Sequence, residues 1–454
     1  MYFMKQIKLT RCIYTPLLLG LTMLLALSAC QPASAPIEPT SAIAITTVST
    51  PTSSPEVPTT IPPTPTLTHT AVPEPTTTTI PSTTPETDQT PTTYGLLDLP
   101  VSNNPLTGLS YPVDSDTTLP PALVSISNSP VTARPQQGLS YAPLVFEIYI
   151  GLGDTRFLAL FQPATLNQLS TQHGGDSVSL GPVRSGRLPY NTLRQFYNAY
   201  IVFAGASNRV LPKLDYYSSV MNYNTGDING ASISAGELRQ LSETFKQDLG
   251  GGDYTGNRYD QQPPSGGKLA NGIWINYHYF SQVFWRYNQE EGAYNRYQND
   301  GEDTPLRQFT DKLNDEPLSF ENVIVLFAQY HFYDPTFFDI DLKYVYRYPA
   351  LLFRDGQVYE IFWTTRSMEY EQSQGRLRPI HFIDYEGNPF QLKNGQTWVE
   401  LVNLYSPYYE TADTEEYKLL VNHKQPESGF WAVQFYMPAF EPYPGGKLPS
   451  GKED

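Results

Sequence analysis

The sequence predicts a mixed α/β (α+β) protein, in which a layered α/β domain at residues 98–320 precedes a smaller, mostly antiparallel β domain at residues 321–440. Two patterns predict this class. Strand-like apolar runs alternate with stretches of helical spacing as far as residue 249, as in layered α/β structures. Beyond residue 321, short β-rich runs are separated by turn residues, which is typical of antiparallel sheets.

Residues 1–29 resemble the signal peptide of a bacterial lipoprotein. Lys5, Lys8 and Arg11 make a basic start, and the apolar run that follows is too short to span a membrane. The segment Leu27-Ser-Ala-Cys30 resembles the lipobox, in which cleavage precedes the cysteine and the thiol receives a diacylglycerol. This resemblance implies a lipid anchor at Cys30 on the extracytoplasmic face of the cell membrane. The alternative is an ordinary signal peptide with a chance cysteine.

Residues 30–97 are rich in Pro, Thr, Ser and Ala and contain no Lys or Arg. This composition cannot bury a core and favours extended polyproline conformations, so we expect a disordered tether. At roughly 3.1 Å per residue, such a tether reaches on the order of 100–200 Å from the membrane. A spacer through a cell-wall layer and a linker of no particular length both fit, and Thr with Pro is also typical of O-glycosylated stalks.

The charge balance argues against nucleic acid as a partner, because a formal net charge of −16 repels a polyanion. Cys12 leaves with the signal peptide and Cys30 takes the lipid, so no disulfide or thiolate metal site is expected. The histidines form no HExxH or other close ligand pair, and we predict no metal site; a carboxylate site for a hard cation is the alternative. The sequence has no P-loop, no GxGxxG after a strand and no GxSxG elbow, so we predict no cofactor.

The strand candidates of the α/β domain are apolar runs that end at turn residues, as at Asn128-Ser-Pro and Gly151-Leu-Gly-Asp. They are residues 122–127, 144–150, 156–161 and 199–205. Helical spacing of apolar residues predicts helices at 188–198, 207–214 and 236–249, the second of them capped by Ser207. Residues 250–267 are rich in Gly and Pro, and we expect a long loop there.

The β domain is predicted from short runs of β-branched, aromatic and other apolar residues. They are residues 322–327, 342–348, 350–353, 358–363, 379–382, 398–402 and 429–435. Turn signals at Asp355-Gly, Glu386-Gly-Asn-Pro and Asn394-Gly separate several of these runs. Residues 441–454 are rich in Pro, Gly and charge, and we expect a flexible tail.

One short segment carries the strongest sign of a binding site. Leu180-Gly-Pro-Val-Arg-Ser-Gly-Arg187 places Arg184 and Arg187 behind a Gly-Pro turn. Pro182 fixes its own φ, and the glycines permit conformations closed to other residues, so we expect a shaped loop. Guanidinium groups bind two oxygens of a carboxylate or phosphate at once, so we predict an anion site at this loop.

Three further residues complete the predicted ligand-binding set: Arg134, Glu147 and Arg156. Glu147 lies within an apolar run, where a carboxylate needs a partner, and Arg156 across the following turn is one candidate. With Arg184 and Arg187, the set fits a pocket for a phosphate- or carboxylate-bearing ligand, such as a cell-wall glycan fragment, or for a protein partner. It equally fits a structural network of ion pairs that closes loops onto the sheet.

A glycan- or phosphate-processing hydrolase of the cell envelope is a further alternative, with Glu147 as its acid or base. This alternative requires the fold to bring Glu147 together with another carboxylate such as Asp154. Nothing in the local sequence brings the two together, so the sequence leaves open whether the protein is an enzyme.

Several motifs together resemble the YerB-type family of bacterial envelope lipoproteins, a family of unknown function. They are Asn104-Pro-Leu-Thr-Gly-Leu, Ala133-Arg-Pro-Gln-Gln-Gly-Leu, Gly153-Asp-Thr-Arg-Phe-Leu-Ala-Leu-Phe, Gly181-Pro-Val-Arg-Ser-Gly-Arg, Ala204-Gly-Ala-Ser, Asn322-Val-Ile-Val and Asp384-Tyr-Glu-Gly-Asn-Pro. The resemblance covers residues 104–405 and implies an N-terminal α/β domain and a smaller C-terminal domain, with no established activity.

The sequence departs from this family at three places. Members usually carry acidic residues where this chain has Ser127 and Gly151, and a His-Asn-Leu-Tyr segment expected near residues 255–275 is replaced by the Gly/Pro-rich loop. If these residues carry chemistry in the relatives, this chain lacks that chemistry.

Overall fold

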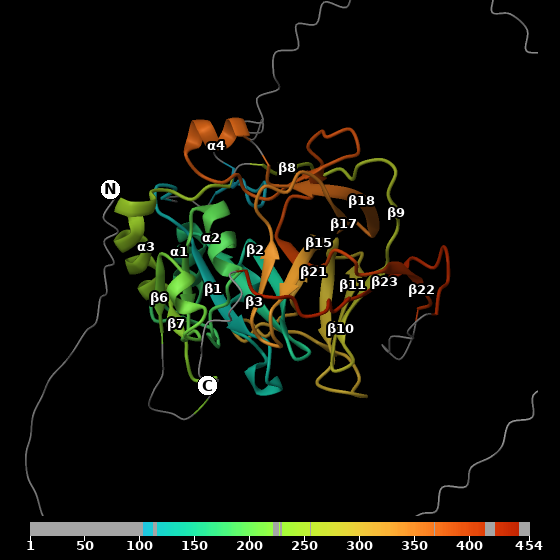
Figure 1. Cartoon of the computed structure of the whole chain (residues 1–454), viewed down its shortest axis with the longest axis horizontal. Helices are drawn as coiled ribbons and strands as arrows, with labels where there is room; N and C mark the ends of the chain where they lie inside the picture. The colour runs from blue at the N-terminus through green and yellow to red at the C-terminus, as the bar shows by residue number, and fades with distance from the viewer. Residues whose placement is uncertain are drawn as a thin grey trace, which may run out of the picture. The chain divides into compact units, whose positions relative to one another are not determined.

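The structure is a computed structural model, and it describes residues 103–111, 116–220, 227, 229–254, 256–366, 368–413 and 423–444. The predicted signal peptide, Cys30 and the tether lie outside these residues. The described chain is a mixed α/β protein dominated by strands, which confirms the predicted fold class (Figure 1). None of its described helices is both long and apolar enough to cross a membrane.

A large mixed sheet forms the centre of the described chain. In spatial order its strands are β19 (His381–Ile383), β18 (Gln357–Thr364), β17 (Tyr348–Arg354), β15 (Asn322–Phe332), β21 (Thr397–Asn403), β2 (Leu144–Gly151), β3 (Asp154–Phe161), β1 (Ala122–Ser127), β5 (Tyr200–Phe203) and β6 (Tyr217–Ser219). Two further strands join it, since β16 (Phe338–Asp341) pairs with β15 and β9 (Lys268–Leu269) pairs with β18.

Five central strands of this sheet, β5, β1, β2, β21 and β15, run in the same direction, and so do β6 and β18. The reason is that β1 and β2 each pair antiparallel with β3, while the pairs β1–β5, β2–β21 and β21–β15 are parallel. The carboxyl ends of all five strands therefore meet at one edge of the sheet. The amino end of β3 lies at the same edge, because β3 runs the opposite way.

A second sheet combines segments that are far apart in the sequence. Its order is β13 (Arg307–Gln308), β12 (Ala293–Gln298), β11 (Ser281–Asn288), β10 (Gly272–His278), β23 (Phe430–Gln434) and β22 (Tyr408–Thr411), with β14 (Ser319–Phe320) on β12. Two small ladders join β20 (Gln391–Leu392) to β8 (Arg258–Tyr259) and β4 (Ser179–Leu180) to β7 (Ile233–Ser234).

The two sheets pack through an aromatic core. The indole ring of Trp398, on β21, lies 5.0 Å from the ring of Phe157, 5.3 Å from that of Trp285 and 5.2 Å from that of Phe320. All four side chains are fully buried. Burial of large aromatic side chains of this kind is the main favourable term in such an interface.

Four helices complete the described chain: α1 (Pro163–Gln172), α2 (Tyr190–Tyr197), α3 (Ala235–Leu249) and α4 (Met368–Gln374). α2 ends at Tyr197 because Asn198 adopts a left-handed conformation with φ of 51°. α3 begins at a capping box, in which Ser234 and Glu237 satisfy each other's backbone N–H groups. The ring of Tyr197 lies 6.0 Å from that of Phe146, so α2 covers the face of β2 that carries Phe146.

Most of the predicted elements are confirmed, and two are wrong. The helix predicted at 207–214 is only a 3-10 turn at Leu211–Lys213, because Pro212 has no N–H to continue a helix. The strand predicted at 342–348 is a turn in which Tyr344 has φ of 58°, and β17 begins only at Tyr348. The tyrosine-rich alternation of this segment imitates a strand, although Tyr344 and Tyr346 are exposed. α1 and the strands β10 to β12 were not predicted.

The predicted N-terminal and C-terminal parts share both sheets. In the large sheet β21 lies between β2 and β15, and in the second sheet β23 pairs with β10. The boundary predicted at residues 320 and 321 therefore divides the sequence, whereas the described strands on its two sides fold into one compact unit. At the C-terminus, residues 441–444 of the predicted tail are described, and the ring of Tyr443 lies 5.0 Å from that of Tyr333.

Candidate anion-binding site

The loop predicted to bind an anion lies between the ends of two parallel strands. β1 and β5 pair only from Ala122 to Val124. Beyond that point the two segments separate, and the loop lies between them. Ser127 N donates to the carbonyl of Pro182 at 2.8 Å, and Arg184 N donates to the carbonyl of Ser125 at 2.8 Å. On the other side, Ala204 N donates to the carbonyl of Arg184 at 2.9 Å, and Gly186 N donates to the carbonyl of Gly205 at 2.9 Å. The backbone of the loop is therefore held on both sides.

Two glycines make this insertion possible. Gly181 has φ of +148°, a backbone conformation that L side chains rarely adopt. A Cβ at Gly186 would lie 3.1 Å from Leu214 and 3.2 Å from Phe203, so these two side chains would have to shift to admit it. The Gly-Pro and Ser-Gly pairs of the motif thus set the path of the backbone, and this path fixes where Arg184 and Arg187 begin.

The loop lies at the edge where the carboxyl ends of the five like-directed strands meet. In open α/β sheets this edge is where ligands bind, because the loops there can diverge and leave room between them. Arg156 lies at the same edge on β3, opposite Ser127 of β1 in the antiparallel ladder. The sheet therefore brings together Arg156, Arg184 and Arg187, which we call the arginine cluster.

Arg156 is a buried cation with few partners of its own. Only 4% of its surface is exposed, and its Nε and Nη1 atoms have no hydrogen-bond partner among the described residues. Burial lowers the pKa of Arg156 to about 9, and the charges of Arg187 and Arg184 act in the same direction. A buried donor without an acceptor costs about 1–3 kcal/mol, and more when it is charged. Two neighbouring cations increase that cost.

Arg187 and Tyr190 complete the surroundings of Arg156. Arg187 is half-buried, its Nη1 donates to the carbonyl of Gly186 at 3.1 Å, and burial lowers its pKa. Tyr190 is fully buried at the start of α2, and its oxygen accepts a long hydrogen bond of 3.5 Å from Ser125 Oγ. Burial raises the pKa of Tyr190, although the charges of Arg156 and Arg187 oppose this shift. Tyr190 therefore keeps its proton and is a neutral donor beside the cluster.

The other two predicted residues, Arg134 and Glu147, lie elsewhere. Glu147 lies opposite Phe157 in the β2–β3 ladder, whereas Arg156 lies opposite Ile148. Because side chains alternate between the faces of a strand, Glu147 and Arg156 point to opposite faces of the sheet. The predicted pairing of Glu147 with Arg156 is therefore wrong, and the five predicted residues form two separate groups.

Glu147 pairs instead with Arg296 of the second sheet. Arg296 Nη2 lies 2.7 Å from Glu147 Oε2, and neither side chain is exposed. Thr155 Oγ1 donates to Glu147 Oε1 at 2.7 Å, and the Arg296 guanidinium lies 4.2 Å from the centre of the Phe309 ring. This is a structural ion pair between the two sheets, and it has no access for a substrate.

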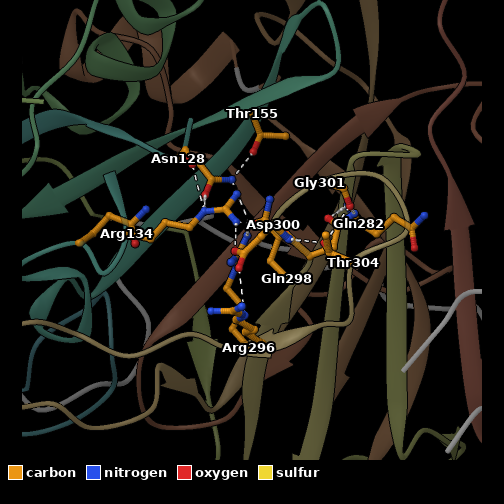
Figure 2. A network of polar contacts seen from close by, with 12 residues as sticks. Asn128, Arg134, Thr155, Gln282, Arg296, Gln298, Asp300, Gly301 and Thr304 are labelled. Carbon is orange, nitrogen blue, oxygen red and sulfur yellow. Dashed lines mark hydrogen bonds and ion pairs between the residues drawn. The ribbon is translucent and has the colours of Figure 1, made fainter. Parts of the chain in front are cut away.

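Arg134 joins the same network at its edge, as Figure 2 shows. Its Nη1 donates to the carbonyl of Asn299 at 2.8 Å and forms an ion pair of 3.2 Å with Asp300. Its Nε donates to the carbonyl of Asn128 at 3.1 Å, and Asn128 Nδ2 in turn donates to Gln298 Oε1 at 3.1 Å. Burial lowers the pKa of Arg134 to about 10, and the charge of Arg296 adds to this shift. Arg134 is therefore bound by the protein itself.

A second carboxylate, Glu400, lies beside this network and was not predicted. Glu147 and Glu400 are register partners in the parallel β2–β21 ladder. Tyr277 Oη and Trp285 Nε1 donate to Glu400 at 2.8 and 2.7 Å. Burial raises the pKa of Glu400 well above its ordinary value, and the charge of Glu147 adds to this. A glutamate within the apolar run 398–402 is the same signal that identified Glu147, so the sequence could have identified Glu400 as a buried carboxylate.

Comparisons with known proteins identify the family. Residues 106–243 match the N-terminal domain of a protein family of unknown function, DUF3048, and residues 273–399 match its C-terminal domain. The chain belongs to this family. It is similar to the crystal structure of the YerB protein from Bacillus subtilis, with 22% sequence identity, a TM-score of 0.51, and coverage of 66% of this chain and 96% of that one. Among curated proteins, none matches the chain.

In this DUF3048 protein, the arginine cluster and the Glu147–Arg296 ion pair are distributed differently over the two matched domains. Arg156, Arg184 and Arg187 all belong to the N-terminal match. The Glu147–Arg296 pair joins the N-terminal match to the C-terminal one. The arginine cluster is thus a feature of one domain, whereas the buried ion pair is part of what holds the two domains together.

Proposed function

We propose that this DUF3048 protein is an extracytoplasmic lipoprotein that binds an anionic ligand of the cell envelope through Arg156, Arg184 and Arg187. The observation that carries the proposal is the buried guanidinium of Arg156, which forms no ion pair with a described carboxylate, has two nitrogen atoms without a hydrogen-bond partner, and has two further cations beside it. A structural role would pair such a group with a carboxylate, as Glu147 is paired with Arg296. An anion from solution would supply the missing acceptors.

The anchor is the part of this proposal that rests on sequence alone. The lipobox-like segment before Cys30 supports it, and Cys30→Ala should release the protein from the membrane fraction because it removes the lipid acceptor. Labelling of cells with a radioactive fatty acid, followed by fractionation, tests this. Unlabelled, soluble wild-type protein would reject the anchor without affecting the anion site.

The hydrolase alternative has no support at Glu147, which is fully buried and ion-paired. Asp154 does not reach it, since Glu147 lies opposite Phe157, and Asp154 lies opposite Gly151. We therefore propose binding and no reaction.

Thermal melting of the full chain with increasing sulfate tests the binding proposal. Sulfate should raise the melting temperature of the wild type, because a ligand that binds only the folded state stabilises it. Arg187→Ala should weaken sulfate binding roughly tenfold or more, since a charge-assisted hydrogen bond contributes on the order of 1.5–3 kcal/mol. Arg187→Lys should be less harmful, because an ammonium keeps the charge and loses only the planar fork.

Arg239→Ala is the matched control. Arg239 is a partly exposed arginine that already pairs with Asp176, so its loss should leave the effect of sulfate unchanged. An equal rise of melting temperature in the wild type, Arg187→Ala and Arg239→Ala would mean that sulfate acts as a general stabilising salt, and it would reject the site.

A further inference from the structure

The charges around the arginine cluster define what kind of anion it fits. The three guanidiniums carry three positive charges, and Asp154 is the carboxylate whose charge acts on each of them. Counted over these four residues, three cations and one carboxylate leave an excess of two positive charges. A single carboxylate or a phosphodiester carries one negative charge and would leave the site positive, whereas a phosphomonoester carries close to two at neutral pH.

The geometry of the donors favours the same ligand. Planar guanidinium groups bind two oxygens side by side, and each of the three begins at a different place on the sheet edge. Arg156 extends from β3, whereas Arg184 and Arg187 extend from the loop between β1 and β5. Tyr190 adds a neutral hydroxyl group beside the cluster, 3.5 Å from Ser125 Oγ. A tetrahedral group with three terminal oxygens can accept from donors that begin on separate backbone segments, whereas a flat carboxylate offers only two oxygens in one plane.

Resting on the proposed function, we infer that the arginine cluster recognises a terminal phosphomonoester in its dianionic form, in preference to phosphodiesters and carboxylates. Such a group occurs on free phosphorylated sugars and on the phosphorylated end of a lipid or a wall polymer. The chemistry recognised is the same in each, and the part of the ligand beyond the phosphoryl group lies outside the cluster.

The charge state of the ligand provides a direct test. The second pKa of a phosphomonoester is about 6, so the dianionic fraction rises from roughly a tenth at pH 5 to about nine tenths at pH 7. Calorimetric titration of the full chain with glycerol phosphate should therefore show an affinity about nine times higher at pH 7 than at pH 5. Dimethyl phosphate, a monoanionic diester, should bind at least tenfold more weakly than glycerol phosphate at pH 7.

Sulfate controls for titration of the protein over the same range. It is a dianion at both pH values, so its affinity should stay constant if the arginines and their neighbours do not change charge. The titratable groups near the cluster are Asp154, Tyr190 and His278, the last of which lies against Gly153 beside Asp154. Dividing the affinity of glycerol phosphate by that of sulfate removes any contribution from them.

A charge variant gives an independent prediction. Asp154→Asn removes the one opposing carboxylate and should tighten glycerol phosphate binding several-fold. Ser127→Asp should abolish binding, because it places a carboxylate opposite Arg156 in the β1–β3 ladder, within reach of its guanidinium. The melting curve of each variant without ligand establishes that it is folded.

The outcomes separate this inference from the proposed function. A ninefold rise for glycerol phosphate, constant sulfate affinity and weak diester binding support the inference. Equal affinities for the monoester and the diester, lost together in Arg187→Ala, would overturn it and leave anion binding intact. Absence of binding by all three anions would overturn both. Vesicles with phosphatidic acid and free glycerol phosphate, compared at equal phosphate concentration, distinguish a lipid from a soluble ligand.

Discussion

At the scale of single residues, Arg296 and Arg134 differ from Arg156 in whether a described carboxylate forms an ion pair with them. Arg296 lies 2.7 Å from Glu147 in a fully buried pair, and Arg134 pairs with Asp300. Nε and Nη1 of Arg156 and of Arg296 alike have no hydrogen-bond partner among the described residues, but Arg156 also forms no ion pair with a carboxylate of the described chain. This difference separates a structural network from a candidate binding site, and no pattern in the sequence indicated it.

The buried Glu147–Arg296 ion pair should affect stability most when one partner is removed and the other is left buried. Arg296→Met should lower the free energy of unfolding by about 3–5 kcal/mol, because it leaves the Glu147 carboxylate buried without a cation. The double variant Glu147→Gln with Arg296→Met should lose at least 1 kcal/mol less than the sum of the two single variants. Urea unfolding of the four proteins measures this.

Arg307→Ala is the control, because the side chain of Arg307 is 75% exposed in its pair with Asp300 and should change stability by less than about 1 kcal/mol. Strictly additive losses for Glu147 and Arg296 would contradict the structural role of the pair.

At the scale of elements, the C-terminal segment is held against the β15–β16 hairpin by a histidine. His331 Nδ1 lies 2.9 Å from Glu441 and its Nε2 lies 3.0 Å from Asp341. The backbone N–H of Glu441 also donates to the carbonyl of Phe332 at 2.7 Å. Two carboxylates around one imidazole favour its charged form, so this attachment depends on pH.

We expect the attachment to weaken as the pH rises. Burial acts to lower the pKa of His331, but its bonds to Glu441 and Asp341 outweigh this and raise the pKa above 6.5. A cation whose pKa is raised on folding gives its full stabilisation below pH 6.5 and loses it as the pH rises through the raised value. The protection factor of the Glu441 amide in hydrogen exchange should therefore fall between pH 6 and pH 9.

The variant His331→Gln should remove this pH dependence, whereas His423→Gln, at an exposed histidine, should keep it. Equal protection of the Glu441 amide in the wild type at both pH values would contradict the role of His331.

The elements themselves were largely predictable. Apolar runs and turn residues located β1, β2, β3 and β21 because these strands are buried throughout, and helical spacing located α3. The segments that were missed or misassigned have mixed polarity. β12, for example, carries Asn295, Arg296 and Gln298 on a buried strand, and only its tertiary partners explain why these polar residues are inside.

The candidate site was also predictable only where a local sequence pattern was sufficient. The motif around Arg184 and Arg187 indicated a shaped loop, and the structure places Arg156 at the same sheet edge. The wrong prediction concerned the partner of Glu147. The turn after β2 brings Arg156 close to Glu147 in the sequence, but the alternation of side chains along the strands puts Arg156 on the other face of the sheet. Arg296 is remote from Glu147 in sequence, so no local pattern could have paired them.

At the scale of the whole molecule, Glu400 links the two sheets through hydrogen bonds. It extends from β21 of the large sheet, while Tyr277 and Trp285, which donate to it, belong to β10 and β11 of the second sheet. A carboxyl group in this position is buried between two layers and next to Glu147. Its protonation should therefore affect the packing of the sheets and the stability of the whole described unit.

Glu400→Gln should change how stability depends on pH. Burial, with the charge of Glu147 acting in the same direction, raises the pKa of Glu400 above 4.5. An acid whose pKa is raised on folding gives its full contribution below about pH 4.5 and loses it as the pH rises through the raised value. Relative to the wild type, the variant should gain stability between pH 5 and pH 8, by up to about 1.4 kcal/mol for each pH unit.

Urea unfolding at both pH values measures this gain, and Glu243→Gln, at an exposed glutamate on α3, should show none. A constant difference between Glu400→Gln and the wild type would mean that Glu400 is ionised throughout.

The thermal melt of Arg187→Ala without added anion tests the central claim most directly. If the arginine cluster is a binding site, the variant should melt within a few degrees of the wild type, or above it, because it removes a cation that repels Arg156. The same variant should no longer respond to sulfate. A loss of about 3–5 kcal/mol, comparable to that of Arg296→Met, would mean that Arg187 is part of a structural network, and it would contradict the account.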